Sequence, residues 1–229
     1  FHLAAKARVQ PSFEDPIGYH RTNVNGTLNL LEACRLSGVK NFVFSSSSSV
    51  YGNYHDYDPF EEWDDLSPDS PYAFQKKIGE EYCKYYWSKY NLDIKVLRYF
   101  NVYGDRMIAG GQYAQAIQIF LNNYKKNEPF NVFGDGEQRR DFTHVSDVVE
   151  ANVLAMNYVS NMSHSIFNIG TGTNYSVNEL CSLINTDNKI NYLPAKSEPK
   201  FTLASTRNVE RYLNWKAKIK LPEWIKERI

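Results

Sequence analysis

Tyr72 and Lys76, four residues apart, are the two side chains of this sequence that are best placed to move a proton. At that spacing on a helix, the phenol and the ammonium lie on one face. A free tyrosine has a pKa of about 10 and is a poor base at neutral pH, but a cation a few ångströms away favours the phenolate and lowers that pKa. The pair therefore predicts acid–base chemistry on a hydroxyl group. Alone the pattern is weak, because tyrosine and lysine occur by chance at this spacing in many helices.

A run of five serines, Ser45 to Ser49, follows the apolar segment Phe42-Val43-Phe44 and precedes Val50-Tyr51-Gly52. A flexible serine linker fits poorly between two such segments. In an open parallel sheet, the carboxyl end of a strand is where ligands bind. A serine there can donate a hydrogen bond to the oxygen that the tyrosine deprotonates. The serines and the Tyr72–Lys76 pair therefore predict one site.

The first half of the chain reads as alternating strands and helices that would position these residues. The apolar segment at residues 1–5 lacks polar alternation, which predicts a strand buried on both faces. The order strand, helix, strand, helix, strand indicates a parallel α/β architecture. The expected elements are a strand at 1–5, a helix at 17–37 stopped by Gly38, a strand at 41–44, a loop at 53–71, a helix at 72–90 and a strand at 92–98.

The second half has a less regular pattern and predicts a smaller lobe beside the sheet. We assign residues 1–104 to the sheet domain and 105–229 mainly to the lobe, with residues from about 140–160 returning to the sheet domain. The turn Gly170-Thr171-Gly172 lacks a third glycine, so it is not a dinucleotide fingerprint, and we assign it to the lobe. The other expected elements are helices at 115–125, 145–158, 209–213 and 222–228, strands at 130–133 and 167–169, and a turn at 134–136.

The composition excludes several classes of protein. Lysine plus arginine and aspartate plus glutamate each number 26, so no net charge attracts nucleic acid or an anionic membrane. No apolar run reaches the ~18 residues of a membrane span, and the first residues lack the pattern of a signal peptide. The cysteines (Cys34, Cys83 and Cys181) and the five histidines lack disulfide or metal spacing, which predicts no metal site and a cytoplasmic location.

Seven segments in the same order along the chain carry a specific resemblance to a known family. The sequence resembles the extended short-chain dehydrogenase/reductases, in particular nucleotide-sugar 4-epimerases of the UDP-glucose/UDP-N-acetylglucosamine type. The resemblance implies a Rossmann-like doubly wound parallel sheet with a smaller C-terminal α/β substrate lobe. The segments are His2-Leu3-Ala4-Ala5, residues 19–27 (YHRTNVNGT) with 30–33 (LLEA), 45–52 (SSSSSVYG), 70–76 (SPYAFQK), 98–104 (RYFNVYG), 133–145 (FGDGEQRRDFTHV) with Asp147, and 168–172 (NIGTG).

The resemblance also implies roles for individual residues. Tyr72 would be the base and acid on the sugar 4-hydroxyl, Lys76 would hold the nicotinamide ribose and lower the pKa of Tyr72, and Ser47 would bind the reacting oxygen. Asn23 would be a structural partner within the cofactor motif. The implied cofactor contacts are Leu3, Ala4, Ala5, Thr22, Asn23, Ser45, Tyr72, Lys76 and Phe100. The implied substrate contacts are Ser47 at the reacting oxygen, Asn101 and Arg140 at the diphosphate, and Asn131, Val132 and Phe133 at the nucleobase.

The implied reaction uses NAD without net redox change. The phenolate takes the proton of the 4-hydroxyl while hydride leaves C4, the 4-keto sugar turns over, and the hydride returns to the opposite face. The resemblance implies a homodimer, and the aromatic residues at 82 and 85–87 are either core or a subunit face. Near the C-terminus, Lys196 or Lys200 stands for an arginine of the family and Glu198 for an aspartate, which leaves the nucleotide open.

The glycine-rich turn of dinucleotide folds and its acidic partner are not found in this sequence. In the family both precede the His-Leu-Ala-Ala strand, so we expect two strand–helix units, on the order of 60–80 residues, to be missing before Phe1. We therefore expect residues 1–229 alone to aggregate or fold partly, because the first strand would leave an open hydrophobic edge, and to bind NAD poorly.

Several alternatives to the 4-epimerase hypothesis remain. A nucleotide-sugar 4,6-dehydratase would carry an Asp-Glu pair where this chain has Ser48-Ser49, and serine cannot do that acid–base work. A non-catalytic dinucleotide-sensing regulator typically loses the tyrosine, which is present here. Decarboxylases, glucuronate epimerases and an inactive fragment unable to bind NAD are further alternatives.

Overall fold

The structure is a computed structural model that describes residues 1–53, 58–107, 116–159, 165–196 and 199–229. Its centre is a parallel sheet in the order β1 (Asn41–Ser47), β2 (Asp93–Tyr99) and β7 (Ser165–Ile169). In register, Ser47 faces Tyr99, and Tyr99 faces Ile169, so the three strands end at one edge. This confirms the parallel α/β prediction.

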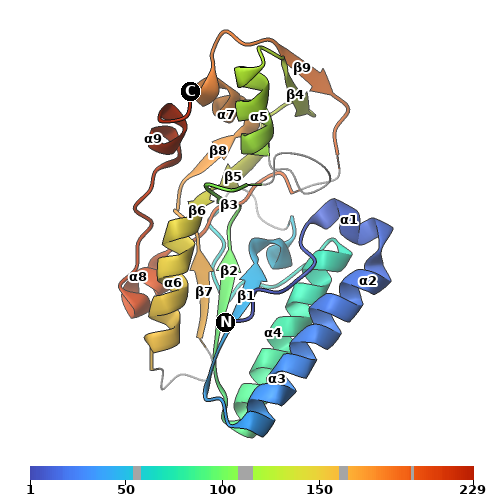
Figure 1. The fold of residues 1–229 in the computed structure, drawn as a ribbon, viewed down its shortest axis with the longest axis vertical. Helices are drawn as coiled ribbons and strands as arrows, with labels where there is room; N and C mark the ends of the chain where they lie inside the picture. Colours follow the sequence, from blue (N-terminus) through green and yellow to red (C-terminus); the bar gives the residue numbers. More distant parts are fainter. Residues whose placement is uncertain (54–57, 108–115, 160–164, 197–198) are drawn as a thin grey trace.

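Helices cover both faces of this sheet (Figure 1). On one face lie α3 (Gly26–Ser37) and α4 (Pro71–Tyr90), and on the other lie α6 (Val145–Asn157) and α8 (Arg207–Leu213). The strands send alternate side chains to the two faces, as a pleated strand must. Phe42, Phe44, Ile94 and Val96 pack with α3 and α4, whereas Val43, Leu97 and Phe167 pack with α6 and α8.

The N-terminal segment lies beside β1, but it is not the strand buried on both faces that its apolar composition predicts. His2 forms a single parallel bridge with Phe44, donating its N–H to the Val43 carbonyl at 2.8 Å. Phe1 and Leu3 are 59% and 61% exposed, whereas His2 is buried. In the described part of the chain no strand pairs with the other edge of this segment, and the face that carries Phe1 and Leu3 is left uncovered.

The helices before β1 and β2 have identifiable start and stop signals. Residues 16–37 are helical throughout as α2 (Pro16–His20), the π-helical η1 (Arg21–Asn25) and α3, after a short α1 (Val9–Glu14). Gly38 ends α3 with φ of 74°, which favours glycine. Ser70 caps α4, accepting a hydrogen bond from the Ala73 N–H at 3.2 Å, and Pro71 takes the first helical position.

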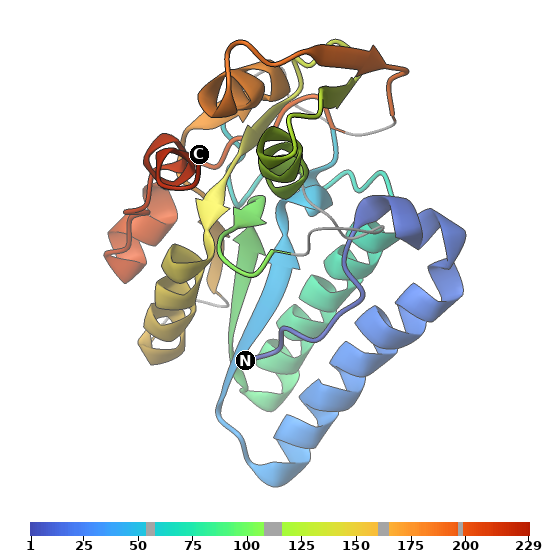
Figure 2. The ribbon, with the colours of Figure 1, turned by 45° about the horizontal axis from the view of Figure 1, so that its top comes forward.

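The second half forms a smaller lobe beyond the carboxyl ends of the sheet (Figure 2). Its core lies between α5 (Ala116–Lys125), α7 (Val177–Ile184) and α9 (Leu221–Lys226). In it, β4 (Phe130–Phe133) pairs in parallel with β9 (Ile190–Leu193), and β5 (Arg139–Asp141) pairs antiparallel with β8 (Asn174–Ser176). The short β3 (Val102–Tyr103) and β6 (Thr143–His144) pair where the lobe joins the sheet.

One assignment from the sequence is wrong. The strand before Gly170 belongs to the central sheet rather than to the lobe, because β7 pairs with β2 along its whole length. The short segment Phe167-Asn168-Ile169 is equally compatible with either sheet, and only the strand pairing decides between them. The return from the lobe to the sheet therefore extends beyond residues 140–160.

Candidate active site

Tyr72 and Ser47 come together at the carboxyl edge of the sheet, where their side chains share a hydrogen bond. Ser47 is the last residue of β1, and Tyr72 lies in the first turn of α4. The Tyr72 N–H donates to the Ser12 hydroxyl at 3.1 Å, which fixes the start of α4 against α1. The Ser47 hydroxyl oxygen also accepts from the Ser49 N–H at 3.2 Å and the Ser49 hydroxyl at 2.9 Å. The predicted pairing of serine and tyrosine is therefore present.

Burial raises the pKa of Tyr72, while its hydrogen bond with Ser47 and the charge of Arg8 lower it. This differs from the expected lowering by Lys76. The Lys76 ammonium lies 6.0 Å from the centroid of the Tyr72 ring and turns toward β1. Arg8, which motif reasoning did not single out, supplies the nearby positive charge. Its φ of 92° is rare for a side-chain-bearing residue, and such backbone conformations concentrate at functional sites.

Lys76 is held by the backbone of β1. Its ammonium donates to the Ser45 carbonyl at 2.7 Å and lies 5.1 Å from the centroid of the Phe44 ring, while the side chain is only 6% exposed. The close approach of α4 to β1 that allows this contact depends on Gly79, one turn further along α4. A Cβ there would lie 2.5 Å from the Phe44 ring. Burial lowers the pKa of Lys76 from 10.5 to about 8. The buried ammonium has this single acceptor within the described part of the chain, so it keeps donors for a ligand.

We expect Lys76→Met to stabilise the fold while abolishing the function of the site. A pKa lowered from 10.5 to about 8 corresponds to a cost of about 3 kcal/mol for burying the charge, so the free energy of unfolding at pH 7 should be ~2–3 kcal/mol higher in the variant. Between pH 8 and 10.5 the unfolded chain holds a proton that the folded chain has released, so wild type gains stability relative to the variant. Urea unfolding of both proteins at pH 7, 9 and 10 measures this. If the variant is less stable than wild type at pH 7, or if the difference in unfolding free energy does not depend on pH, burial of the ammonium does not destabilise the fold.

A buried polar network connects the elements that carry the site, and it was not predicted from the sequence. Arg98 on β2 is 2% exposed and forms a bidentate ion pair with Glu80 on α4, with Nε–Oε1 at 3.0 Å and Nη2–Oε2 at 2.7 Å. Arg98 also donates to the Tyr51 hydroxyl at 2.8 Å, and Tyr51 donates to Asn168 on β7 at 2.7 Å. The network therefore ties α4 to β2 and β7. An arginine near the carboxyl end of a central strand, close to the predicted site, was the available signal.

The predicted cofactor residues fall into two groups. Leu3, Ala4 and Thr22 are exposed and Ala5 is half-buried, so these residues have surface to offer a ligand. Asn23, Ser45 and Phe100 are 3%, 5% and 0% exposed. Asn23 is the structural partner that was expected: it accepts from the Lys6 N–H at 2.8 Å and donates to Gln75 at 3.1 Å. The Ser45 hydroxyl bonds with the Tyr99 hydroxyl at 3.0 Å, and Phe100 packs against Tyr51. Ser45 and Phe100 therefore present no free side-chain surface.

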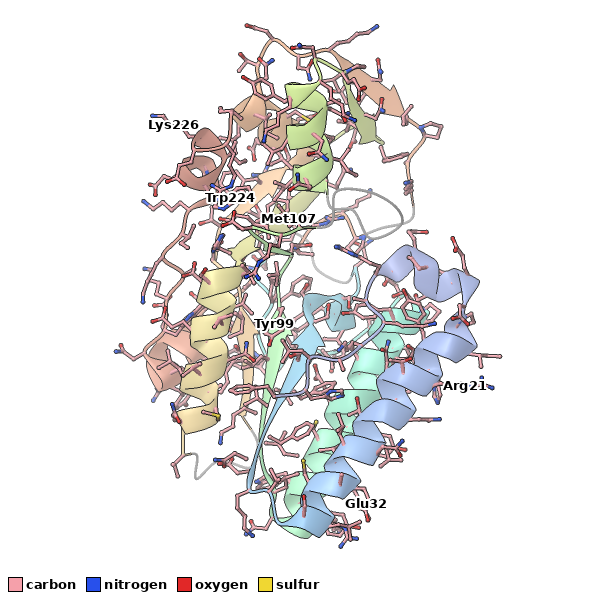
Figure 3. The ribbon with its side chains drawn as sticks, in the orientation of Figure 1. Arg21, Glu32, Tyr99, Met107, Trp224 and Lys226 are labelled. Carbon is pink, nitrogen blue, oxygen red and sulfur yellow. The ribbon has the colours of Figure 1, made fainter. Side chains whose placement is uncertain are left out.

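In Figure 3, Tyr99 lies near the centre of the view, over the sheet, whereas Arg21 and Glu32 lie on the outer side of the helices.

The predicted diphosphate residues lie at the junction of sheet and lobe. Arg140 is half-buried on β5, with its Nη1 donating to the Arg139 carbonyl at 2.9 Å. The Asn101 side-chain amide donates both of its hydrogens within the protein, to the Asp141 carbonyl at 2.9 Å and to the Thr202 hydroxyl at 3.1 Å. A phosphate contact from this amide therefore requires one of these bonds to open.

The predicted nucleobase residues alternate along β4. Asn131 is exposed, Phe133 is half-buried, and the side chain of Val132 is 1% exposed in the lobe core. Val132 can therefore reach a base only through its backbone, because its side chain points to the opposite face of the strand. Lys196 lies 3.5 Å from the centroid of the Phe133 ring. Glu198 lies outside the described residues.

The described residues contain neither a metal-binding cluster nor a membrane-spanning helix. No group of three or more histidine, cysteine, aspartate or glutamate side chains could hold a metal ion there. Nor does a helix in those ranges have both the length and the apolar character that crossing a membrane requires.

Comparison with known proteins identifies similar chains. Residues 1–170 match the model of the NAD dependent epimerase/dehydratase family. A UDP-glucuronate 4-epimerase of Thermodesulfobacterium geofontis is 37% identical over 100% of this chain and 70% of its own length. A UDP-glucose 4-epimerase of Thermotoga maritima, solved with UDP-glucose, is 36% identical with a TM-score of 0.93, over 100% of this chain and 74% of that one. A UDP-glucose 4-epimerase of Thermus thermophilus, solved with NAD, is 32% identical with a TM-score of 0.90, over 99% and 75%.

Proposed function

Because this chain belongs to the NAD-dependent epimerase/dehydratase family, we propose that the protein inverts C4 of a nucleotide-activated sugar through a 4-keto intermediate. The observation that carries the proposal is the hydrogen bond between Tyr72 and Ser47 near the buried ammonium of Lys76. Both groups lie at the carboxyl edge of a parallel sheet, where ligands bind in such folds. UDP-glucose and its 4-epimer are the substrates we propose first.

The residues present fit the dinucleotide that the family uses. Lys76 is a buried donor with one acceptor in the described part of the chain, and a ribose diol would satisfy its remaining hydrogens. Leu3, Ala4, Ala5 and Thr22 offer surface on the segments beside β1 and α3. We propose that these residues and Tyr72 hold NAD. The chemistry that NAD would supply there is reversible acceptance of a hydride.

The protein's own residues would manage the proton and the position of the sugar. Ser47 would hold O4 by a hydrogen bond, and Tyr72 would take the O4 proton and later give one back. Burial raises the pKa of Tyr72 and therefore works against the phenolate, whereas the charge of Arg8 favours it. Arg140 would bind the diphosphate, since a guanidinium matches phosphate oxygens. Residues 1–104 would form the cofactor-binding part together with α6, β7 and α8, and the rest of residues 105–229 would form the substrate lobe.

The site speaks against the dehydratase alternative. That reaction needs a carboxyl pair to expel the C6 hydroxyl, and this chain has Ser48 and Ser49 there. Ser48 is 8% exposed, and Ser49 donates its hydroxyl to Ser47. Neither hydroxyl can serve as a strong acid or base at neutral pH.

The proposal is tested by the products that the protein forms with NAD. UDP-glucose, UDP-N-acetylglucosamine and UDP-glucuronate are each incubated with it, and the products are identified by NMR. We expect inversion at C4 without a change at C6. A 4-keto-6-deoxy product would establish the dehydratase instead, a pentose product from UDP-glucuronate would establish a decarboxylase, and no conversion of any nucleotide sugar would contradict the proposal.

We also propose that the outer face of α4 pairs two subunits into a homodimer. Phe74 and Tyr85 are 54% and 49% exposed there, and with Ile78 and Tyr82 they line a shallow groove of about 450 Å³. These positions follow helical spacing, and one helix face can meet its own copy across a two-fold axis. Of the aromatic residues singled out in the sequence, Tyr86 is buried and donates to Glu32 at 3.0 Å, so it belongs to the core. The cytoplasmic location stays a prediction.

We expect Tyr85→Glu to weaken self-association at least ~10-fold, because two carboxylates would face each other across the axis. Sedimentation velocity over a range of concentrations measures the effect. Tyr192→Glu is the matched control, since Tyr192 is 56% exposed on β9, away from α4. Equal dimerisation by wild type and Tyr85→Glu would exclude this face, as would a monomeric wild type.

A further inference from the structure

Asp141, at the end of β5, is a buried carboxylate that gathers hydrogen bonds from two separate segments. It is 0% exposed and accepts from the Thr171 N–H at 2.9 Å, the Thr171 hydroxyl at 2.7 Å and the Gly172 N–H at 3.0 Å. It also accepts from the Ala204 N–H at 3.2 Å. Burial raises the pKa of Asp141 to about 6, so the group is mainly ionised at pH 7 and can accept all four bonds.

The backbone of Asp141 holds two further residues of the same junction. Its carbonyl accepts from the Asn101 amide at 2.9 Å, and its N–H donates to the Thr202 carbonyl at 3.1 Å. Thr202 in turn donates its N–H to the Arg139 carbonyl at 3.0 Å. The residue therefore ties β5 to the segment after β2, to the turn after β7 and to residues 202–204.

The packing around the carboxylate leaves little room for movement. A Cβ at Gly170 would lie 2.3 Å from the Ala204 Cβ and 2.8 Å from an Asp141 carboxylate oxygen. Only glycine therefore allows the end of β7 to approach this closely. The junction is held at one spacing by packing as well as by hydrogen bonds.

We propose that Asp141 is a positioning residue that holds Arg140 in place for the diphosphate of the nucleotide sugar. The inference rests on the proposed function, which gives Arg140 that ligand. Successive side chains of a strand point to opposite faces, so Asp141 lies on the face opposite Arg140 and acts through the backbone of β5. Its charge is needed because every partner of the carboxylate is a donor. An asparagine would place its own NH2 against one of them.

The experiment compares the affinity of the full protein for UDP and for uridine by calorimetry. We expect Asp141→Asn to weaken UDP binding about 10-fold to 100-fold, with uridine binding changed by less than ~2-fold. KM for the nucleotide sugar should rise in step while kcat changes little, whereas a fold that is merely damaged lowers the active fraction without moving KM. Asp187→Asn, on an exposed turn of the lobe, is the matched control.

Thr171→Val keeps the test decisive if Asp141→Asn does not fold. It removes one donor to the carboxylate and should weaken UDP binding about 3-fold to 10-fold, again sparing uridine. Unchanged UDP affinity in a folded variant, or equal losses for UDP and uridine, would overturn the role of Asp141 while leaving the proposed function intact. A wild-type protein that binds no UDP would instead overturn the proposed function, and this role with it.

Discussion

Tyr72→Phe should lower kcat for C4 inversion about 100-fold to 10,000-fold while KM changes by less than ~3-fold. The substitution removes the group that would take the O4 proton and leaves the ring that fills the start of α4. The Tyr72 hydroxyl bonds with Ser47, and Ser47 keeps its bonds with Ser49 in the variant. The measurement is steady-state kinetics with UDP-glucose and NAD, together with thermal unfolding of both proteins.

Tyr86→Phe is the matched control for this prediction. It removes a tyrosine hydroxyl from the same helix, where that hydroxyl donates to Glu32 at 3.0 Å away from the sheet edge. We expect its kcat to stay within ~2-fold of wild type. If Tyr72→Phe kept more than ~10% of wild-type kcat, Tyr72 would not be the base. If both variants lost activity equally, the loss would lie in the packing of α4.

Arg98→Met should lower the free energy of unfolding by about 3–5 kcal/mol, the largest effect on stability that we expect. The Glu80 carboxylate is 5% exposed and loses a bidentate partner, keeping a hydrogen bond from the Ser46 hydroxyl. Tyr51 and the Glu62 carbonyl each lose a donor as well. Urea unfolding followed by circular dichroism measures the change.

Two companion variants separate charge from packing. Arg98→Met with Glu80→Leu should lose less stability than Arg98→Met alone, because no carboxylate is left buried without its partner. Arg35→Met breaks the surface pair of Arg35 and Glu32, with side chains 36% and 40% exposed, and should cost less than ~1 kcal/mol. A loss below ~1 kcal/mol for Arg98→Met would show that the network does not hold α4 to the sheet.

Local signals in the sequence were sufficient for the framework of the fold. The helix at 72–90 and the strand at 92–98 were predicted because helical spacing and strand alternation act within a few residues. The strand before Gly170 was misplaced because sheet membership depends on partners that are distant in sequence. The exposure of Leu3 could not be inferred from apolar composition, because burial depends on what lies beside a strand.

The site was predicted as a set of residues and only partly as an arrangement. The position of the serine run at a strand end predicted a serine beside Tyr72, the family resemblance implied that it is Ser47, and the structure contains this pair. The spacing of Lys76 placed it on the face of Tyr72 but could not show that its ammonium turns to the Ser45 carbonyl. The effect of the Arg8 charge on Tyr72 and the hydrogen bonds of Asp141 are contacts between residues that are distant in sequence. No rule of sequence spacing predicts such contacts.

The central claim is that Tyr72, Ser47 and Lys76 act at C4 of a nucleotide sugar without net redox change. The most direct measurement uses UDP-glucose labelled with deuterium at C4, incubated with the full protein and NAD in ordinary water and followed by NMR. We predict a 4-epimer that keeps the deuterium at C4 in wild type and is almost absent in Tyr72→Phe. Loss of the label to solvent during inversion, or a deoxygenated C6 in the product, would contradict the account.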